Sequence, residues 1–431
     1  MRTPPEVPPA TTARSLHTLG VICGLAAATW LAGAEAPTKL VTTGLSPFMI
    51  SLAMVAGVFV ARWTLPTLLK GTGYVFTDLR EKSHLVIWAV LAGSLWAVGN
   101  TLTIFAVRDV GLSIAFPLWN VNSLVGVFWG WFFFRELRGA GPANWAKVVG
   151  GASAILLGAV LLGYASSHEA SSSPPRAVAG IAAAVGAGLM FGTMYIPYRK
   201  AYLSGMNPIS FVTVFTVGEV ITMSSLAVAF RGGVEQVLTD LSQARPVLFW
   251  LFLGGFCWVV GDLFQNYAAK YIGIGRGIPL SNTNQLWGLV WGALAFGEFA
   301  GRGSATLGLV VVGSVTMILG GVAISMAAAP RAEQASTQEA IARECERYGL
   351  NHESAQASQR GEDVVAREAP AHRWWDGLIV AGAVGVFLWL GWMAKVPPIR
   401  MDTAWMLALV LVMLAFLIVS GWILWRRTRF S

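Results

Sequence analysis

Twelve runs of about 20 mostly apolar residues follow one another along this chain, and each is long enough to cross a bilayer as an α-helix. Only 12% of the residues are charged, against about 25% in an ordinary soluble domain. This composition excludes a soluble globular fold, a disordered chain and a disulfide-rich scaffold, and it predicts an all-α polytopic membrane protein. The twelve runs lie at residues 18–38, 46–65, 85–107, 112–134, 144–164, 177–198, 208–230, 246–268, 274–297, 304–328, 375–394 and 403–425.

Basic residues predict the orientation in the membrane. The chain has 30 Lys and Arg against 22 Asp and Glu, but the basic residues form short clusters between apolar runs rather than a nucleic-acid-binding surface. Most of them, including Arg62 and Lys70 at the end of the second run, fall on the side of the N-terminus, which the positive-inside rule assigns to the cytoplasm. We therefore expect an inner (cytoplasmic) membrane protein with both termini in the cytoplasm and no nucleic-acid partner.

An internal repeat organises the first ten spans. Residues 91–139 align without a gap onto 253–301, and earlier spans align more weakly, for example Pro37 with Pro197. Each unit contains five spans, and an odd number places the second unit upside down relative to the first. The sequence therefore predicts a ten-helix, 5+5 inverted-repeat bundle, with repeat 1 at 17–164 and repeat 2 at 177–328. In such bundles the solute site lies near the midplane between the repeats.

The rest of the chain adds two spans and polar segments. We expect a cytoplasmic tail at 1–16, a cytoplasmic polar linker at 329–374, two additional transmembrane helices within 375–425, and a cytoplasmic tail at 426–431. Residues 335–350 begin with Ser and Thr and end near a glycine, which predicts a short surface helix in the linker. The two additional spans either pack on the edge of the bundle or mediate a homodimer.

Short motifs at the ends of the fourth and ninth spans carry a family resemblance. Phe134-Arg135-Glu136 and Phe296-Gly297-Glu298 end these spans, and each follows a Pro-Leu-x-Asn-x-Asn block and a Gly-x-x-Trp-Gly block. Over 17–328 the chain resembles the drug/metabolite transporter superfamily, and within it the glucose/ribose/rhamnose uptake branch. The resemblance implies a solute carrier that is often sugar-directed and often coupled to protons or sodium. The chain departs from the usual ten-span pattern from residue 329 onward.

Aromatic and amide side chains recur on repeat-equivalent helices. Trp96 and Trp258 are equivalent, and each is followed by polar residues on the same helical face. Aromatic rings stack on the apolar face of a sugar, and amides bind hydroxyl groups both as donors and as acceptors. The alternative is a polar seam that joins helices. The candidate substrate-binding residues are Trp96, Asn100, Asn120, Asn122, Trp258, Asp262, Gln265, Asn266, Asn282, Asn284 and Gln285.

Two mid-span acids break the repeat. Asp262 replaces Asn100, and Glu219 aligns with Val58. Carboxylates within a membrane bundle are typical of proton pathways, so both are candidates for proton coupling, with Asp262 first. The alternatives are that Asp262 pairs with Lys270 or meets water near the inner mouth, and that Glu219 binds a helix backbone.

A third group of candidates lies beside the prolines of the first and sixth spans. Glu35 and Tyr195 each stand two residues before the matched prolines, Pro37 and Pro197. Proline kinks free backbone carbonyls, so we expect these four residues to form gates near opposite mouths or, alternatively, simple packing kinks. Glu136 and Glu298 are expected to close a turn or to bond with the next helix.

No other motif indicates catalysis or a cofactor. The chain has no Walker A sequence, its five histidines lack metal-ligand spacing, and no nucleophile or pair of acids stands near one interface. We therefore expect no enzyme activity, no metal and no cofactor. The leading hypothesis is a secondary active transporter of a sugar or similar small polar solute. The alternatives are a carrier or exporter of drugs, nucleosides or ureides, and a non-transporting membrane assembly subunit.

Overall fold

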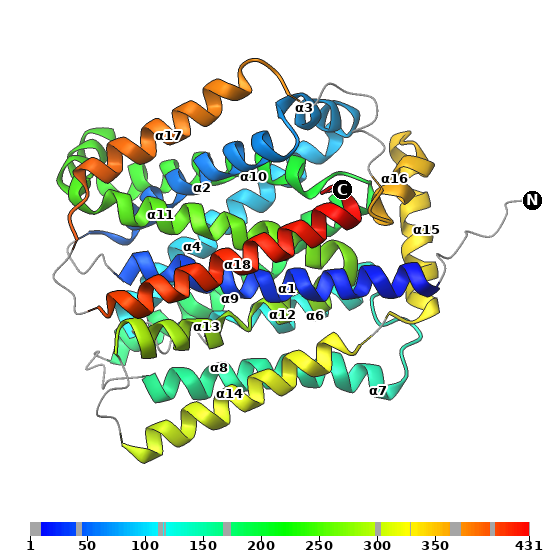
Figure 1. Cartoon of the computed structure of the whole chain (residues 1–431), viewed down its shortest axis with the longest axis horizontal. Coiled ribbons are helices and arrows are strands. Elements are labelled where there is room, and N and C mark those ends of the chain that lie inside the picture. Colours follow the sequence, from blue (N-terminus) through cyan, green and yellow to red (C-terminus); the bar gives the residue numbers. More distant parts are fainter. Residues whose placement is uncertain are drawn as a thin grey trace, which may run out of the picture.

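The computed structural model describes residues 10–39, 45–110, 115, 118–166, 174–297, 303–327, 329–362, 372–396 and 401–430. Throughout these residues the regular structure is helical, and ten of the helices are long and apolar enough to cross a membrane. The chain is therefore an all-α, multi-pass membrane protein. Figure 1 shows the long helices lying side by side, with their ends gathered at two opposite faces.

The helices of the two repeats follow the predicted spans. Repeat 1 contains α1 (Ala10–Lys39), α2 (Pro47–Leu69), α3 (Thr72–Glu81), α4 (Val86–Val110), α6 (Asn122–Phe134), α7 (Pro142–Trp145) and α8 (Gly151–Ser166). Repeat 2 contains α9 (Pro174–Leu203), α10 (Pro208–Arg231), α11 (Val234–Ile272), α12 (Ile274–Ser281), α13 (Asn284–Val290) and α14 (Ser304–Ser325). Short segments complete the spans: the 3-10 helix η1 (Ser83–Leu85) and the π-helices η2 (Ala146–Gly150) and η3 (Trp291–Ala295).

The fourth and ninth spans are interrupted at equivalent places. A turn at Asn120 and Val121 precedes α6, and a turn at Asn282 and Thr283 separates α12 from α13. Apolar content alone would favour continuous helices here. At the second break the Ser281 and Thr283 hydroxyls donate to the backbone carbonyls of Ile278 and Leu280, and Pro279 removes one backbone donor within α12.

Equivalent glycines bring the helices of the two repeats into backbone contact. At each contact a Cβ on the glycine would collide with a carbonyl oxygen of the facing helix, so only glycine fits. The contacts join α2 to α11 and α4 to α10: Gly57 with Phe252, Gly255 with Met54, Gly93 with Phe215, and Gly218 with Val90. The second interface uses the repeat equivalents of the first. The same pairs of equivalent positions therefore build both interfaces.

The linker after repeat 2 is structured. It forms α15 (Arg331–Tyr348) and α16 (His352–Gln359) at the face that carries both chain ends in Figure 1. The predicted helix exists and ends before Gly349, but it begins four residues earlier than expected, after Pro330. One face of this helix, with Glu333, Ile341 and Cys345, is buried against the bundle, and the opposite face, with Glu339 and Arg343, is exposed.

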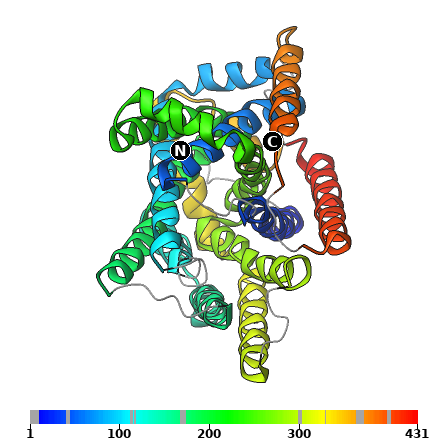
Figure 2. The ribbon, with the colours of Figure 1, turned by 90° about the vertical axis from the view of Figure 1, so that its left-hand side faces the viewer.

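The two additional spans pack on the edge of the bundle, the first of the two alternatives. They are α17 (Asp376–Met393) and α18 (Thr403–Thr428), and Figure 2 shows both on one flank. On α17, Phe387 packs edge-on between Phe252 and Phe256 of α11. On α18, the backbone carbonyl of Met413 accepts a hydrogen bond of 3.2 Å from the Trp30 indole of α1.

Candidate functional site

Three charged side chains meet inside the helical bundle. Arg62 of α2, Glu219 of α10 and Asp262 of α11 are each 0% exposed. The Arg62 guanidinium donates a hydrogen bond of 2.8 Å from Nη2 to Oδ2 of Asp262, and the same nitrogen lies 3.7 Å from Oε1 of Glu219. Charges this far from water are costly and rarely serve packing alone, which makes this charged cluster the main candidate site.

Aromatic rings enclose the charged cluster. The Arg62 guanidinium lies over the Phe215 ring, 3.9 Å from its centroid, and 5.4 Å from that of Trp258. Trp258 in turn contacts its repeat equivalent Trp96, with ring centroids 4.8 Å apart. Tyr198 of α9 packs edge-on against Phe215, with ring centroids 5.4 Å apart. The two predicted substrate-binding tryptophans are therefore brought together where the two repeats meet, beside a cation.

The cluster has more negative than positive charge and leaves polar atoms unused. With all three groups ionised its net charge is −1. Nε and Nη1 of Arg62, both carboxylate oxygens of Glu219 and Oδ1 of Asp262 have no hydrogen-bond partner among the described residues. Buried polar groups normally have partners. The cluster is thus chemically equipped to take up a proton, water or a polar solute.

Local sequence features position these groups. α2 and α10 begin alike, with Ser46 and Asn207 as N-caps and a proline in the first turn. Beyond these caps, Gly57 lets the backbone of α2 approach α11 closely. Arg62, more than one turn further along α2, thereby reaches Asp262 of α11.

Four of the eight predicted amides join helices rather than facing the cluster. Asn282 donates to Asn122 at 2.5 Å, linking the ninth span to the fourth. Gln265 donates to Ser281 at 2.5 Å, and Asn100 donates to Ser51 at 2.5 Å. These bonds have the geometry of the polar-seam alternative.

The remaining amides are placed differently. Asn266 accepts a hydrogen bond from the Tyr202 hydroxyl and donates one to the backbone carbonyl of Asp262, so it borders the charged cluster. Asn120, Asn284 and Gln285 are partly or fully buried, and each has one side-chain polar atom without a hydrogen-bond partner among the described residues.

The predicted gate residues are placed unequally. Tyr195 and Pro197 are buried in α9, and Tyr195 lies near the charged cluster, where it interacts electrostatically with Asp262 and Arg62. The side chains of Glu35 and Pro37 lie outside the described residues, as does Glu298.

Two sequence-based interpretations were wrong. Arg62 was assigned to the cytoplasmic charges, but it is buried in the bundle because α2 continues past the predicted end of the span to Leu69. Asp262 pairs with Arg62 and not with Lys270, whose Nζ instead donates to the Ser358 hydroxyl at 3.2 Å. One signal could have revealed Arg62: it aligns with Met223 in the repeat, so it breaks the symmetry as Glu219 and Asp262 do.

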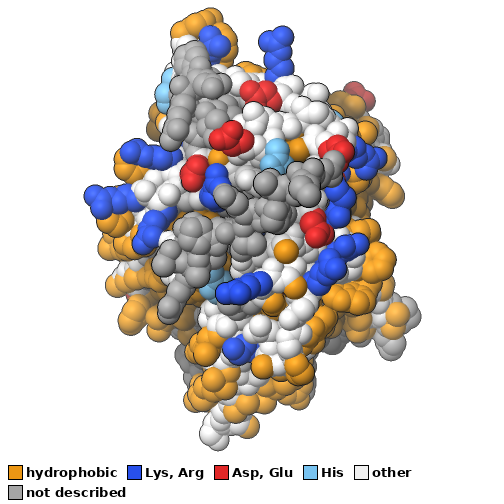
Figure 3. All heavy atoms as spheres, turned by 90° about the vertical axis from the view of Figure 1, so that its right-hand side faces the viewer, with side chains coloured by type: hydrophobic (Ala, Val, Ile, Leu, Met, Phe, Trp, Pro, Cys, Tyr) orange, Lys and Arg blue, Asp and Glu red, His pale blue; other side chains and the backbone are white. Residues whose placement is uncertain are grey.

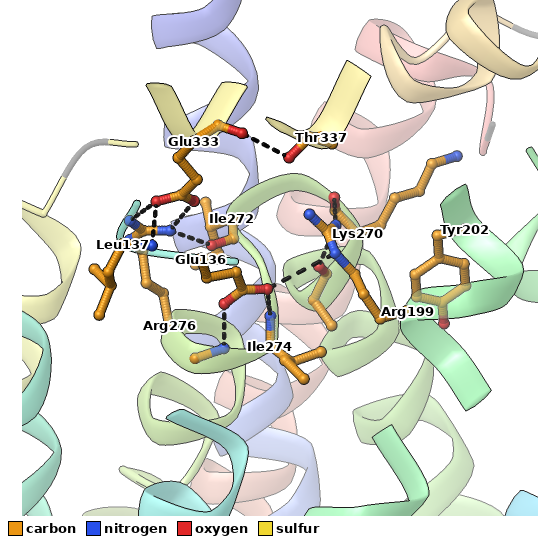
Figure 4. Close-up of polar contacts among 12 residues, drawn as sticks. Glu136, Leu137, Arg199, Tyr202, Lys270, Ile272, Ile274, Arg276, Glu333 and Thr337 are labelled. Atoms are coloured by element: carbon orange, nitrogen blue, oxygen red, sulfur yellow. Dashed lines mark hydrogen bonds and ion pairs between the residues drawn. The ribbon is translucent and has the colours of Figure 1, made fainter. Parts of the chain in front are cut away.

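A second polar network lies at the face that carries the chain ends (Figure 4). Glu136, after α6, accepts hydrogen bonds from the backbone N–H groups of Ile274 (3.0 Å) and Gly275 (2.9 Å) and so caps α12 of the ninth span rather than bonding with the next helix in the chain, as the sequence had suggested. Arg199 lies 3.7 Å from the same carboxylate. Burial raises the pKa of Glu136 above its ordinary value, against the opposing effect of Arg199.

The same network extends into α15. Glu333 binds the Arg276 guanidinium through two hydrogen bonds of 2.7 and 2.8 Å and also accepts one from the backbone N–H of Leu137 at 2.8 Å. Figure 3 shows Lys, Arg, Asp and Glu side chains gathered on this face. The network therefore connects repeat 1, repeat 2 and the linker at one mouth of the bundle.

A groove of about 700 Å³ lies away from both networks, between α2, α10, α11 and α17. Its walls are almost entirely apolar, with Val55, Phe252 and Trp389 among them and Arg245 as its only charged side chain. It lacks the polar groups that a hydrophilic solute needs, and we do not assign it to the functional site.

Comparisons with known proteins point to sugar uptake proteins. Residues 216–345 match the model of a family described as "Sugar transport protein", a range that includes Glu219, Asp262 and Glu333. The chain is 24% identical over 258 residues to "Putative sugar uptake protein lmo0169" of Listeria monocytogenes, covering 59% of this chain and 84% of that protein. It is 22% identical over 275 residues to "Probable glucose uptake protein GlcU" of Staphylococcus aureus, covering 60% and 86%.

A solved structure resembles the fold. One crystal structure superposes with a TM-score of 0.50 at 16% identity, covering 72% of this chain and 97% of the other. This likeness supports the helical architecture of the bundle and carries no information about the solute.

Proposed function

We propose that this chain is a secondary active transporter that moves a sugar or a similar small polar solute across the cytoplasmic membrane. In this proposal it is a member of the drug/metabolite transporter superfamily, with both termini in the cytoplasm and two inverted five-helix repeats that give alternating access. The similarity to sugar uptake proteins over most of their length supports the solute class. The observation that carries the proposal is the buried Arg62–Asp262–Glu219 cluster beside Trp96 and Trp258.

The two tryptophans are the proposed solute contacts. Trp96 belongs to repeat 1 and Trp258 to repeat 2, and their rings are in contact in this structure, so a solute that binds beside them, or between them once they separate, would touch both repeats. Ring faces suit the C–H surface of a sugar, and the unused nitrogens of Arg62 offer donors to its hydroxyl groups. Movement of one repeat relative to the other would then change the site itself, as alternating access requires.

The charge imbalance supports proton coupling. A fully buried cluster with net charge −1 becomes neutral when one carboxylate binds a proton. Asp262 accepts a hydrogen bond from Arg62, whereas Glu219 lies farther from Arg62 and has no hydrogen-bond partner among the described residues. Glu219 is therefore the proposed proton carrier, and Asp262 is the lasting partner of Arg62. This reverses the order of the two acids that the sequence suggested.

Uptake by the purified protein in proteoliposomes tests the proposal. The panel contains hexoses, pentoses, nucleosides and ureides, each measured with a proton gradient, a sodium gradient and no gradient. We expect sugar uptake that a proton gradient accelerates. If folded wild-type protein moves none of the solutes under any gradient, the transport proposal is wrong. Uptake restricted to nucleosides or ureides would replace sugar with that solute class.

A further inference from the structure

The segment α15–α16, called the latch below (residues 331–359), lies across one mouth of the bundle. Figure 1 shows it standing at the ends of the long helices, roughly across their direction, whereas α17 and α18 run along them. It follows repeat 2 directly and precedes α17. A connecting linker needs no fixed contacts with the helices that it crosses, so its contacts indicate a further role.

Ion pairs fix the first half of the latch to both repeats. Glu333 is 5% exposed and binds the Arg276 side chain at the start of α12 in a two-bond arrangement. The same carboxylate accepts a hydrogen bond from Leu137, between the fourth and fifth spans. Further along, both carboxylate oxygens of Glu344 lie 2.9 Å from Nζ of Lys200 on α9.

Aromatic and polar contacts fix the second half. The Tyr348 ring stacks on His84, before α4, with centroids 3.8 Å apart and planes 13° from parallel. On α16, the Ser358 hydroxyl accepts a hydrogen bond from Lys270, and Gln359 donates one of 2.5 Å to the backbone carbonyl of Tyr202.

Apolar packing completes the attachment. Ile341, Cys345 and Ala355 of the latch are at most 4% exposed and form one hydrophobic cluster with Leu203 at the end of α9. A Cβ on the adjacent Gly205 would press against the backbone of Ala355. The latch is thus docked through a small core of its own as well as through charges.

We propose that the latch locks this mouth of the transporter in its closed state and that it must shift away for the solute to pass. The proposal rests on the transport function proposed above. Its contacts include His84 and Leu137 of repeat 1 as well as Lys200 and Arg276 of repeat 2. Alternating access requires the repeats to separate at each mouth in turn, and a segment bound to both opposes that separation.

Cross-linking the closed latch tests this directly. Cys345 is native, and Leu203→Cys places a second thiol in the same buried cluster. Burial raises the pKa of the Cys345 thiol, so a short thiol-specific cross-linker is used in place of slow air oxidation. We expect cross-linked protein to lose uptake and to regain it when a cleavable linker is reduced. Solute binding from the opposite side, measured by tryptophan fluorescence, should persist.

The control is Leu203→Cys combined with Cys345→Ser, treated in the same way, which should keep its uptake. The cross-linked fraction is quantified by mass spectrometry. Full uptake by fully cross-linked protein would overturn the proposal, because the latch would then be an immobile brace. Absence of uptake before cross-linking would instead count against the transport function, and these two failures are distinguishable.

A charge variant tests the latch independently of transport. The pair between Glu344 and Lys200 is partly exposed, so Glu344→Gln should increase latch opening about two- to five-fold without unfolding the protein. The readout is the rate at which a maleimide labels Cys345 in the wild-type background. Glu339→Gln, on the exposed side of the same helix, is the matched control and should leave that rate unchanged. Equal labelling rates in the two variants would contradict the proposal.

Discussion

Replacing Glu219 by Gln tests how the buried charges couple transport to protons. At an effective dielectric constant of about 20, the attraction of Arg62 is ~6 kcal/mol for Asp262 at 2.8 Å and ~4.5 kcal/mol for Glu219 at 3.7 Å. Asp262 also accepts a charge-assisted hydrogen bond worth about 1.5–3 kcal/mol, which Glu219 lacks. The Coulombic difference alone favours the proton on Glu219 over Asp262 by about 1.5 kcal/mol, or roughly ten-fold, and the hydrogen bond acts in the same direction.

Glu219→Gln removes the proton carrier and leaves the Arg62–Asp262 pair neutral. In proteoliposomes, a gradient of about one pH unit should drive up to about ten-fold accumulation by the wild type at one proton per solute. The variant should approach equal concentrations on both sides, while exchange of labelled for unlabelled solute continues. Ser225→Ala, an exposed position on the same helix, is the matched control and should accumulate solute like the wild type.

Two results would refute this reasoning. Ten-fold accumulation by Glu219→Gln would show that the proton binds elsewhere. If Glu219→Gln loses both exchange and accumulation while its melting temperature stays normal, Glu219 takes part in solute binding. Asp262→Asn separates the two acids, because it leaves Arg62 with Glu219 alone. If Asp262→Asn leaves both accumulation and exchange normal, Asp262 has no part in coupling.

Three further changes have expected outcomes. Trp258→Leu removes a ring from the proposed solute contact and should raise the KM for uptake about five-fold, and an unchanged KM would exclude stacking there. Gly57→Ala places a Cβ against the carbonyl oxygen of Phe252 and should lower the melting temperature by the equivalent of about 1–3 kcal/mol, whereas Gly377→Ala, which faces open space, should not. Burial raises the pKa of Glu136 above 4.5, so wild-type stability should fall as the pH rises from 4.5 through that raised pKa, and Glu136→Gln should show a flatter decline over the same range in thermal melts at stepped pH.

The transmembrane architecture was predictable because it depends on local composition. Ten of the twelve predicted spans coincide with a helical stretch long and apolar enough to cross a membrane. The ninth consists of shorter helical pieces separated by a turn, and the fourth is described only in part. Hydropathy over about 20 residues decides whether a segment enters the bilayer, and that quantity is read directly from the sequence. The bonding of Glu136 to α12 was not anticipated, because the expected partner was the next helix and α12 is distant in the sequence.

The charged cluster was only half predictable because its pairing is non-local. Asp262 and Glu219 were found from their loss of repeat symmetry, but their shared partner Arg62 is far away in the chain and stands near the end of an apolar run. In the sequence, an arginine at such a position resembles the cytoplasmic basic residues of the positive-inside rule. Glu333 was missed for the same reason, since Arg276 also resembled a cytoplasmic charge.

Some residues are equivalent in the two repeats and others are not, and this difference suggests how solute movement is coupled to proton binding. The glycine contacts and the Trp96–Trp258 pair involve equivalent residues of both repeats. The helical bundle could therefore adopt two conformations of similar energy, in which the repeats swap their arrangements. The charges are not shared: Arg62, Glu219 and Asp262 occupy positions whose equivalents are Met223, Val58 and Asn100. A change from one conformation to the other would therefore alter the surroundings of Glu219, and no carboxylate in repeat 1 would undergo the opposite change, because its equivalent there is Val58. In the proposed mechanism a proton bound to Glu219 would favour one conformation over the other, which a fully symmetric pair of repeats would not do.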